Sequence, residues 1–205
     1  MKTHEKIWTY VAIVVGVPVA VFALVSWYES RISGLPVVGP KEHKVGAFTF
    51  VNQDNRTITQ QSWETKIIVA AYFFTHCPAV CPKMVSNLKS IRDLNDSRIS
   101  INTFSVDPER DNVEQLGAYA RRFSIRSDWN LLTGDKKELY RFARKDLLLV
   151  ATDGDGGEDD FIHSENFVLI DPQKRIRGYY RGTNKADVDQ LIRDIGKLKE
   201  EYQLD

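Results

Sequence analysis

The stretch Lys66–Met84, KIIVAAYFFTHCPAVCPKM, decides the fold class because it leads from a buried strand straight into a helix. Its first part, residues 66–74, is a continuous apolar run after the leading lysine, the pattern of a strand buried on both faces. Met84, Leu88 and Ile91 then recur at helical spacing. A doubly buried strand followed by a helix is typical of α/β domains.

The flanking sequence extends this pattern to a complete domain. Residues 98–105 (RISINTFS) predict a second strand, and Asp111 with Glu114 three residues later predicts a capped helix that ends near Phe123. Other expected elements are a hairpin at 47–51 and 57–58, a short helix at 136–144, a hairpin at 166–170 and 176–180, and a closing helix over 188–198. The expected fold is a three-layer α/β/α domain whose mixed sheet has helices on both faces.

Length and composition narrow the function classes. The chain has 205 residues, enough for one domain with an appendage. Its 28 basic and 28 acidic residues balance, whereas nucleic-acid binders normally carry a basic excess, so no nucleic-acid partner is expected. Two cysteines exclude a disulfide-dense scaffold, a zinc ribbon and a four-cysteine iron–sulfur site within this chain.

The N-terminus predicts a membrane anchor. Residues 7–28 contain no charge, and about 20 residues of helix cross a bilayer core. A cleaved signal peptide is the alternative, but residues 25–28 (VSWY) lack a small-x-small cleavage site. We therefore expect a cytoplasmic N-terminus at 1–6, a transmembrane anchor at 7–28, a linker at 29–40 and a folded domain at 41–205. The expected location is the bacterial inner (cell) membrane, single-pass, with the C-terminal domain facing the periplasm or cell exterior.

Both cysteines lie at the junction between the first long strand and its helix. Pro78 predicts an early helical position, which places Cys77 at the helix N-terminus, where thiolates are stabilised. A spacing of four puts the sulfurs of Cys77 and Cys81 on one helix face. They could hold one metal ion or close a short disulfide. The alternative is a purely structural pair, since both also fit the core stripe that continues through Met84.

Three further side chains are candidates for this site. His163 precedes a strand of the sheet, and loops at one sheet edge converge, so it can reach the cysteines. His76 directly precedes Cys77 and could tune its thiolate. Asp107 is a candidate for an outer-shell group, although a turn before Pro108 explains it as well. Residues 153–160 form an acidic loop that we expect to be solvated, because it lacks the final glutamate of an EF-hand.

Residues 75–84 resemble the signature of the Sco/SenC family of copper chaperones. Further segments match in order along the chain: 105–111, 129–134, 163–164 with 169–172, and 175–180. The resemblance spans roughly residues 40–200. Five ordered motifs make it specific, whereas a lone pair of cysteines would not.

The resemblance implies a thioredoxin-like fold and a membrane-anchored copper chaperone. It implies that copper, as Cu(I) or Cu(II), is held by Cys77, Cys81 and His163, and that the partner is an oxidase subunit, whose binuclear copper centre is being built in cytochrome c oxidase. A thiol reductant protein is a further expected partner, because Cys77 and Cys81 would also form a redox-active disulfide. Many members carry an acidic residue between the cysteines, where this chain has Ala79 and Val80.

Other functions stay open from the residues alone. In a thiol–disulfide oxidoreductase, Cys77 would attack a partner disulfide and Cys81 would resolve the mixed disulfide. Thioredoxin-type enzymes have two residues between the cysteines, and this chain has three. A redox or copper sensor is a third hypothesis. Soft thiolates favour Cu(I), but the same donor set also binds zinc.

Overall fold

The computed structural model describes residues 14–28, 34–126, 128–149 and 164–204. The chain divides into two units, Met1–Gly34 and Leu35–Asp205. In the first unit, residues 14–28 are helical, and their large apolar side chains are exposed. Within the described part of the chain, no helix has the length and apolar character needed to cross a membrane. Residues 7–13 of the predicted anchor lie outside that part.

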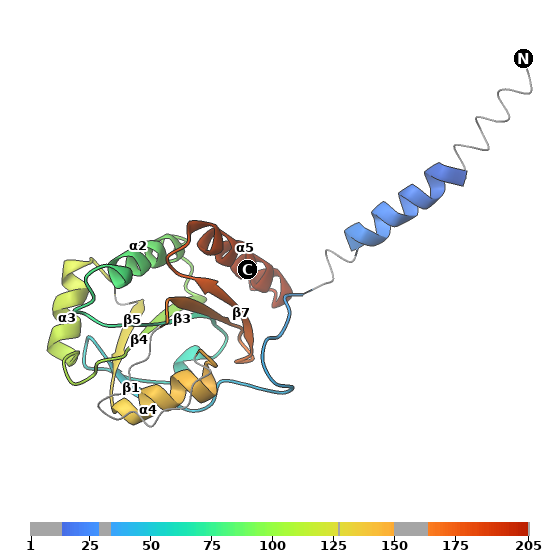
Figure 1. Ribbon diagram of the computed structural model, residues 1–205. Coiled ribbons are helices and arrows are strands. Elements are labelled where there is room, and N and C mark those ends of the chain that lie inside the picture. Colours follow the sequence, from blue (N-terminus) through green and yellow to red (C-terminus); the bar gives the residue numbers. More distant parts are fainter. Residues whose placement is uncertain (1–13, 29–33, 127, 150–163, 205) are drawn as a thin grey trace, which may run out of the picture. The chain divides into compact units, whose positions relative to one another are not determined.

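The second unit is built on one mixed sheet of seven strands in the order β2-β1-β5-β4-β3-β6-β7 (Figure 1). Strand β3 (Ile67–Phe73) pairs in parallel with β4 (Ile99–Ser105) and antiparallel with β6 (Asn166–Ile170). The remaining strands are β1 (Thr49–Asn52), β2 (Thr57–Thr59), β5 (Trp129–Thr133) and β7 (Ile176–Arg181). The predicted mixed sheet is confirmed.

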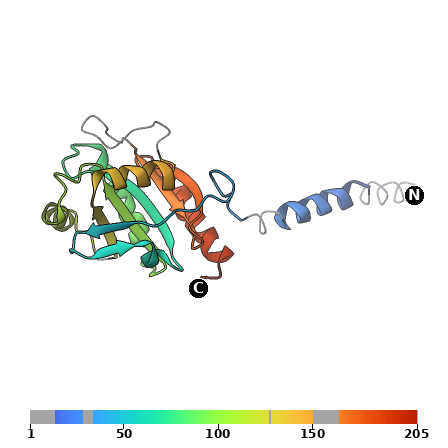
Figure 2. The same ribbon diagram turned by 90° about the horizontal axis from the view of Figure 1, so that it is seen from below.

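Helices cover both faces of this sheet, as predicted. One face packs against α2 (Val80–Arg92), α3 (Val113–Arg122) and α5 (Lys185–Glu201). The other face packs against α4 (Lys136–Arg141) and the π-helical turn η2 (Phe142–Asp146), and Figure 2 shows α4 lying across the strands. A short 3-10 helix, η1 (Gln60–Trp63), follows β2.

Strand β3 is the centre of the domain, as its apolar sequence predicts. Each of its residues is at most 3% exposed. Alternate side chains enter the two cores, so that Ile67 and Val69 face α2 and α5 while Ile68 and Tyr72 face α4. The strand therefore holds its carboxyl end, and the cysteine loop that follows, on a rigid support.

Two predicted helix starts are wrong by one or two residues. Helix α2 begins at Val80 with Ala79 as its N-cap, so Pro78 is not helical and Cys77 lies outside the helix rather than on its face. Helix α3 is capped by Asn112, whose side chain accepts a hydrogen bond from the Gln115 backbone N–H at 2.9 Å. Asp111 is not the cap because its carboxylate is engaged elsewhere.

Strand β5 was not among the predicted elements. Its sequence, WNLLT, has few β-branched residues, and its burial comes from a central position between β1 and β4. The acidic loop at 153–160 lies outside the described residues, so its predicted character stays a prediction.

Candidate metal centre

The carboxyl ends of β3 and β4 bring two loops together. Residues 74–79 connect β3 to α2, residues 106–112 connect β4 to α3, and the Val106 N–H donates to the Phe73 carbonyl at 2.9 Å. Because β6 runs antiparallel to β3, the residues before β6 return to the same edge. A cavity of about 350 Å³ at this edge is lined by Cys77, Cys81, Ser164 and Glu165, together with Tyr72, Phe73, Phe74, Val80, Met84 and Val106.

Cys77 is a half-buried free thiol at the start of α2. Its Sγ accepts a hydrogen bond from the Cys81 backbone N–H at 3.3 Å, so the sulfur partly fills the place of a helix cap. Burial alone would raise the pKa of Cys77. Hydrogen bonds from the N–H groups of Cys81, Ala79 and Val80 and from the Cys81 thiol outweigh burial and lower this pKa. The thiolate of Cys77 is therefore stabilised, although the residue precedes the helix.

Cys81 has the opposite character. It is 4% exposed and packs in the core between β3 and the helices. Burial first, and then the hydrogen bond and charge of Cys77 and the charge of Asp111, raise the pKa of Cys81 to about 12. The predicted pair is thus asymmetric: Cys77 is the accessible thiolate, and Cys81 is a buried thiol. This fits neither a purely structural core pair nor two equivalent ligands in the metal-free protein.

Asp111 is the carboxylate that supports the cysteine loop. It is fully buried and accepts hydrogen bonds from the Thr75 backbone N–H at 3.2 Å, the Thr75 hydroxyl at 2.5 Å and the Ser105 hydroxyl at 2.6 Å. These bonds join the end of β3 to the end of β4, two residues before Cys77. Sequence reasoning missed this role because Asp111 also fits a helix-cap pattern. The adjacent Asn112, a better-placed cap, was the available signal.

The other predicted side chains have distinct surroundings. The exposed His76 has its Nδ1 3.0 Å from the Thr75 hydroxyl. The Asp107 carboxylate lies 3.7 Å from the Arg110 guanidinium, and its contact with this region is through its backbone N–H, which donates to Ser105 at 2.9 Å. His163 lies outside the described residues. Among the residues described, no group of three His, Cys, Asp or Glu side chains could hold a metal ion.

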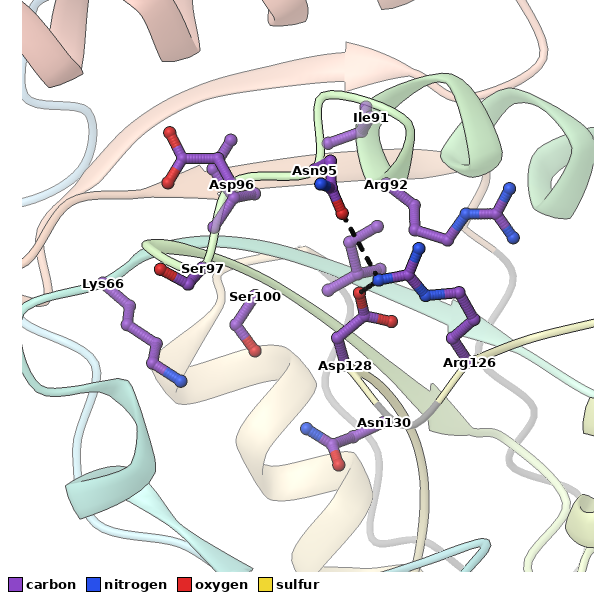
Figure 3. Close-up of a pocket in the computed structure, with 12 residues that line it drawn as sticks. Lys66, Ile91, Arg92, Asn95, Asp96, Ser97, Ser100, Arg126, Asp128 and Asn130 are labelled. Carbon is purple, nitrogen blue, oxygen red and sulfur yellow. Dashed lines mark hydrogen bonds and ion pairs between the residues drawn. The ribbon is translucent and has the colours of Figure 1, made fainter. Parts of the chain in front are cut away.

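A second cavity, of about 430 Å³, lies at the opposite ends of the same strands (Figure 3). It is lined around the starts of β4 and β5, where Arg126 pairs with Asp128 at 2.9 Å and contacts Asn95 at 3.5 Å. Its lining contains neither cysteine nor histidine, so it is separate from the thiol chemistry.

Fold and site together define a class: a thioredoxin-like domain with a Cys-x-x-x-Cys pair in the loop after a central strand. Comparison with known proteins identifies the family. The model of the SCO1/SenC family matches residues 38–200, and the chain belongs to this family.

Individual relatives agree with this assignment. A SCO1 protein homolog from Bacillus subtilis strain 168 is 30% identical over 177 residues, which cover 84% of this chain and 91% of that protein. The chain spans about half the length of the mitochondrial SCO1 homologs that it matches.

Two solved structures show the same fold. BsSco, a Sco-family cytochrome c oxidase assembly protein with a disulfide switch, matches with a TM-score of 0.65 and 28% identity over 79% of this chain and 96% of that chain. Arabidopsis thaliana ScoI with copper bound matches with a TM-score of 0.60 and 25% identity over 74% of this chain and 98% of that chain.

Proposed function

We propose that this protein is a copper chaperone that delivers copper to the binuclear copper centre of a cytochrome c oxidase subunit. The observation that carries the proposal is the thiol pair on the rigid carboxyl end of β3, with one accessible thiolate and one buried thiol facing the same cavity. The relatives that bind copper or assemble an oxidase support the same role.

The proposed copper ligands are the sulfurs of Cys77 and Cys81 and the imidazole of His163. Thiolates are soft donors that suit Cu(I), and imidazole suits either oxidation state of copper. Ser164 and Glu165, which follow His163 directly, line the cavity that also contains both cysteines. That adjacency supports the assignment of His163 as the third ligand.

Copper is cargo in this proposal, so it must enter and leave without a net reaction of the protein. Cys77, whose pKa is lowered, would bind first, and Cys81 would lose its proton as the metal binds. Transfer to the oxidase subunit would then exchange one ligand at a time. Two thiolates and one nitrogen leave room for a ligand from the recipient.

Equilibrium titration with Cu(I) against a competing chelator tests this function. The reduced, metal-free full-length protein should hold one copper ion, and both Cys81→Ala and His163→Ala should weaken binding. His43→Gln is the matched control, because the His43 ring contacts the Asp146 carbonyl instead of the site. Wild-type binding no tighter than that of Cys81→Ala would contradict a copper site.

The asymmetry of the two thiols also favours a second function, the reduction of a partner disulfide. The Cys77 thiolate would attack one partner sulfur, and the other would leave as a thiolate. Cys81, after losing its proton, would attack Cys77 and release the second partner thiolate. The partner gains two electrons, and a thiol reductant protein must then reduce the Cys77–Cys81 disulfide. Dithiol turnover retained in His163→Ala would favour this function over copper delivery.

We also propose that residues 7–28 anchor the protein in the bacterial inner (cell) membrane, with the folded domain facing the periplasm or cell exterior. The uncharged sequence supports this, as do the helical backbone and exposed apolar side chains at residues 14–28. Protease digestion of intact spheroplasts should remove the domain. Full protection of the domain would contradict the orientation.

A further inference from the structure

Thr75 is the centre of a hydrogen-bond chain that runs from the interior to the surface beside Cys77. Its hydroxyl lies 2.5 Å from Oδ1 of Asp111, 3.3 Å from Nε2 of Gln115 and 3.0 Å from Nδ1 of His76. Asp111 and Thr75 are buried, whereas His76 is exposed. A buried carboxylate is thereby connected to a surface imidazole through one hydroxyl.

The direction of each bond in this chain follows from the donors available. A hydroxyl has one proton and two acceptor lone pairs. The Thr75 proton is donated to the Asp111 carboxylate, and the Gln115 amide N–H donates to one Thr75 lone pair. The remaining lone pair must face a donor, so the contact with His76 requires a proton on Nδ1. The neutral ring of His76 therefore keeps its free lone pair on Nε2.

This arrangement is the one that prepares a histidine to bind a metal. Metal-ligating histidines usually donate their other ring N–H to a carboxylate, carbonyl or water, which fixes both tautomer and ring orientation. Here the Thr75 hydroxyl takes that position and is itself held by Asp111. The prepared ring belongs to an exposed residue immediately before the half-buried Cys77 thiol.

We propose that Nε2 of His76 is a transient copper ligand that receives incoming Cu(I) together with Cys77, before the ion moves to the site of Cys77, Cys81 and His163. Asp111 and Thr75 are its positioning residues. Each step forms one bond from copper to a protein ligand and breaks one bond from copper to its donor, with no change in oxidation state. This inference rests on the proposed copper-binding function and extends it to the entry of the metal.

The tautomer is tested first, on reduced, metal-free full-length protein in mildly alkaline buffer. The ¹⁵N chemical shifts of the His76 ring, assigned by comparison with His76→Asn, should show a protonated Nδ1 and an unprotonated Nε2. Thr75→Val removes the hydroxyl and should abolish this preference, whereas Thr75→Ser should keep it. A wild-type ring protonated on Nε2 overturns the proposal.

Copper entry is tested next by the rate of Cu(I) uptake from a bathocuproine disulfonate complex. His76→Asn is the decisive variant, because an asparagine N–H can replace the Nδ1–H bond to Thr75 but supplies no imidazole lone pair. Uptake by this variant should slow by about tenfold, the lower end of the usual effect of disturbing a metal site, at unchanged equilibrium affinity. Thr75→Val should also slow uptake, and Thr75→Ser should restore it. Uptake by His76→Asn at the wild-type rate overturns the proposal.

The two levels of inference fail in different ways. If the wild-type protein holds no Cu(I) at equilibrium, the proposed function fails. If it holds Cu(I) and His76→Asn loads at the wild-type rate, only the role of His76 in entry fails. A large loss of equilibrium affinity in His76→Asn would also overturn the proposal, because His76 would then be a permanent ligand.

Discussion

Asp111 accepts hydrogen bonds from both the backbone N–H and the side-chain hydroxyl of Thr75, at 3.2 and 2.5 Å. This contact fastens the cysteine loop to the loop after β4 and connects a buried charge to the metal-binding region. The same charge contributes to the raised pKa of Cys81. Asp111 therefore influences both the shape and the electrostatics of the site without being a proposed ligand.

Removing the Asp111 carboxylate should destabilise the domain. Asp111→Ala leaves the N–H and hydroxyl of Thr75 and the hydroxyl of Ser105 without their acceptor, so we expect a loss of about 3 kcal/mol in the free energy of unfolding. Asp107→Ala is the matched control: its carboxylate pairs with an exposed arginine at 3.7 Å and should contribute about 0.5 kcal/mol. Urea denaturation measures both. Equal losses in the two variants would contradict the role given to Asp111.

The two thiols should differ in reactivity with pH. Alkylation requires the thiolate, and the pKa of Cys77 is lowered while that of Cys81 is raised to about 12. Iodoacetamide should therefore modify Cys77 alone, with a pH midpoint below that of an ordinary thiol. Mass spectrometry of the reduced, metal-free protein measures the rate at each residue. Cys81→Ser should keep a midpoint below the ordinary value, because the backbone donors to Cys77 remain. Faster modification of Cys81 would refute the asymmetry.

Two glycines should respond in opposite ways to alanine. A Cβ on Gly182 would lie 2.5 Å from the buried Phe167 ring and 2.8 Å from the Glu165 carbonyl, so Gly182→Ala should cost about 2 kcal/mol through overpacking. A Cβ on Gly196, within α5, would meet nothing within 4 Å, and Gly196→Ala should stabilise the domain by about 1 kcal/mol. Thermal unfolding measures both changes. A stable Gly182→Ala protein would show that the segment next to Glu165 can shift freely.

The sequence predicted the parts of the fold in which local pattern and burial agree. The apolar run of residues 67–73 became the central strand, and the stripe of Met84, Leu88 and Ile91 became the buried face of α2. Strand β5 was missed because WNLLT has little local strand preference and owes its burial to neighbouring strands that are distant in sequence.

The candidate site was predictable in composition but not in detail. Cys77 and Cys81 could be located from their spacing, yet the helix start at Val80 depends on the three-dimensional course of the loop. Two neighbouring residues, Asp111 and Asn112, both suit a helix cap. Only the buried contacts with Thr75 and Ser105 show which of them serves the site instead.

The most direct test of the central claim is X-ray absorption at the copper edge of the Cu(I)-loaded full-length protein. The account predicts two sulfur neighbours and one nitrogen neighbour. The nitrogen should disappear in His163→Ala and persist in His76→Asn, because His76 is a ligand only during entry. A nitrogen shell retained in His163→Ala, or a site with sulfur ligands alone in the wild type, would contradict copper binding by Cys77, Cys81 and His163.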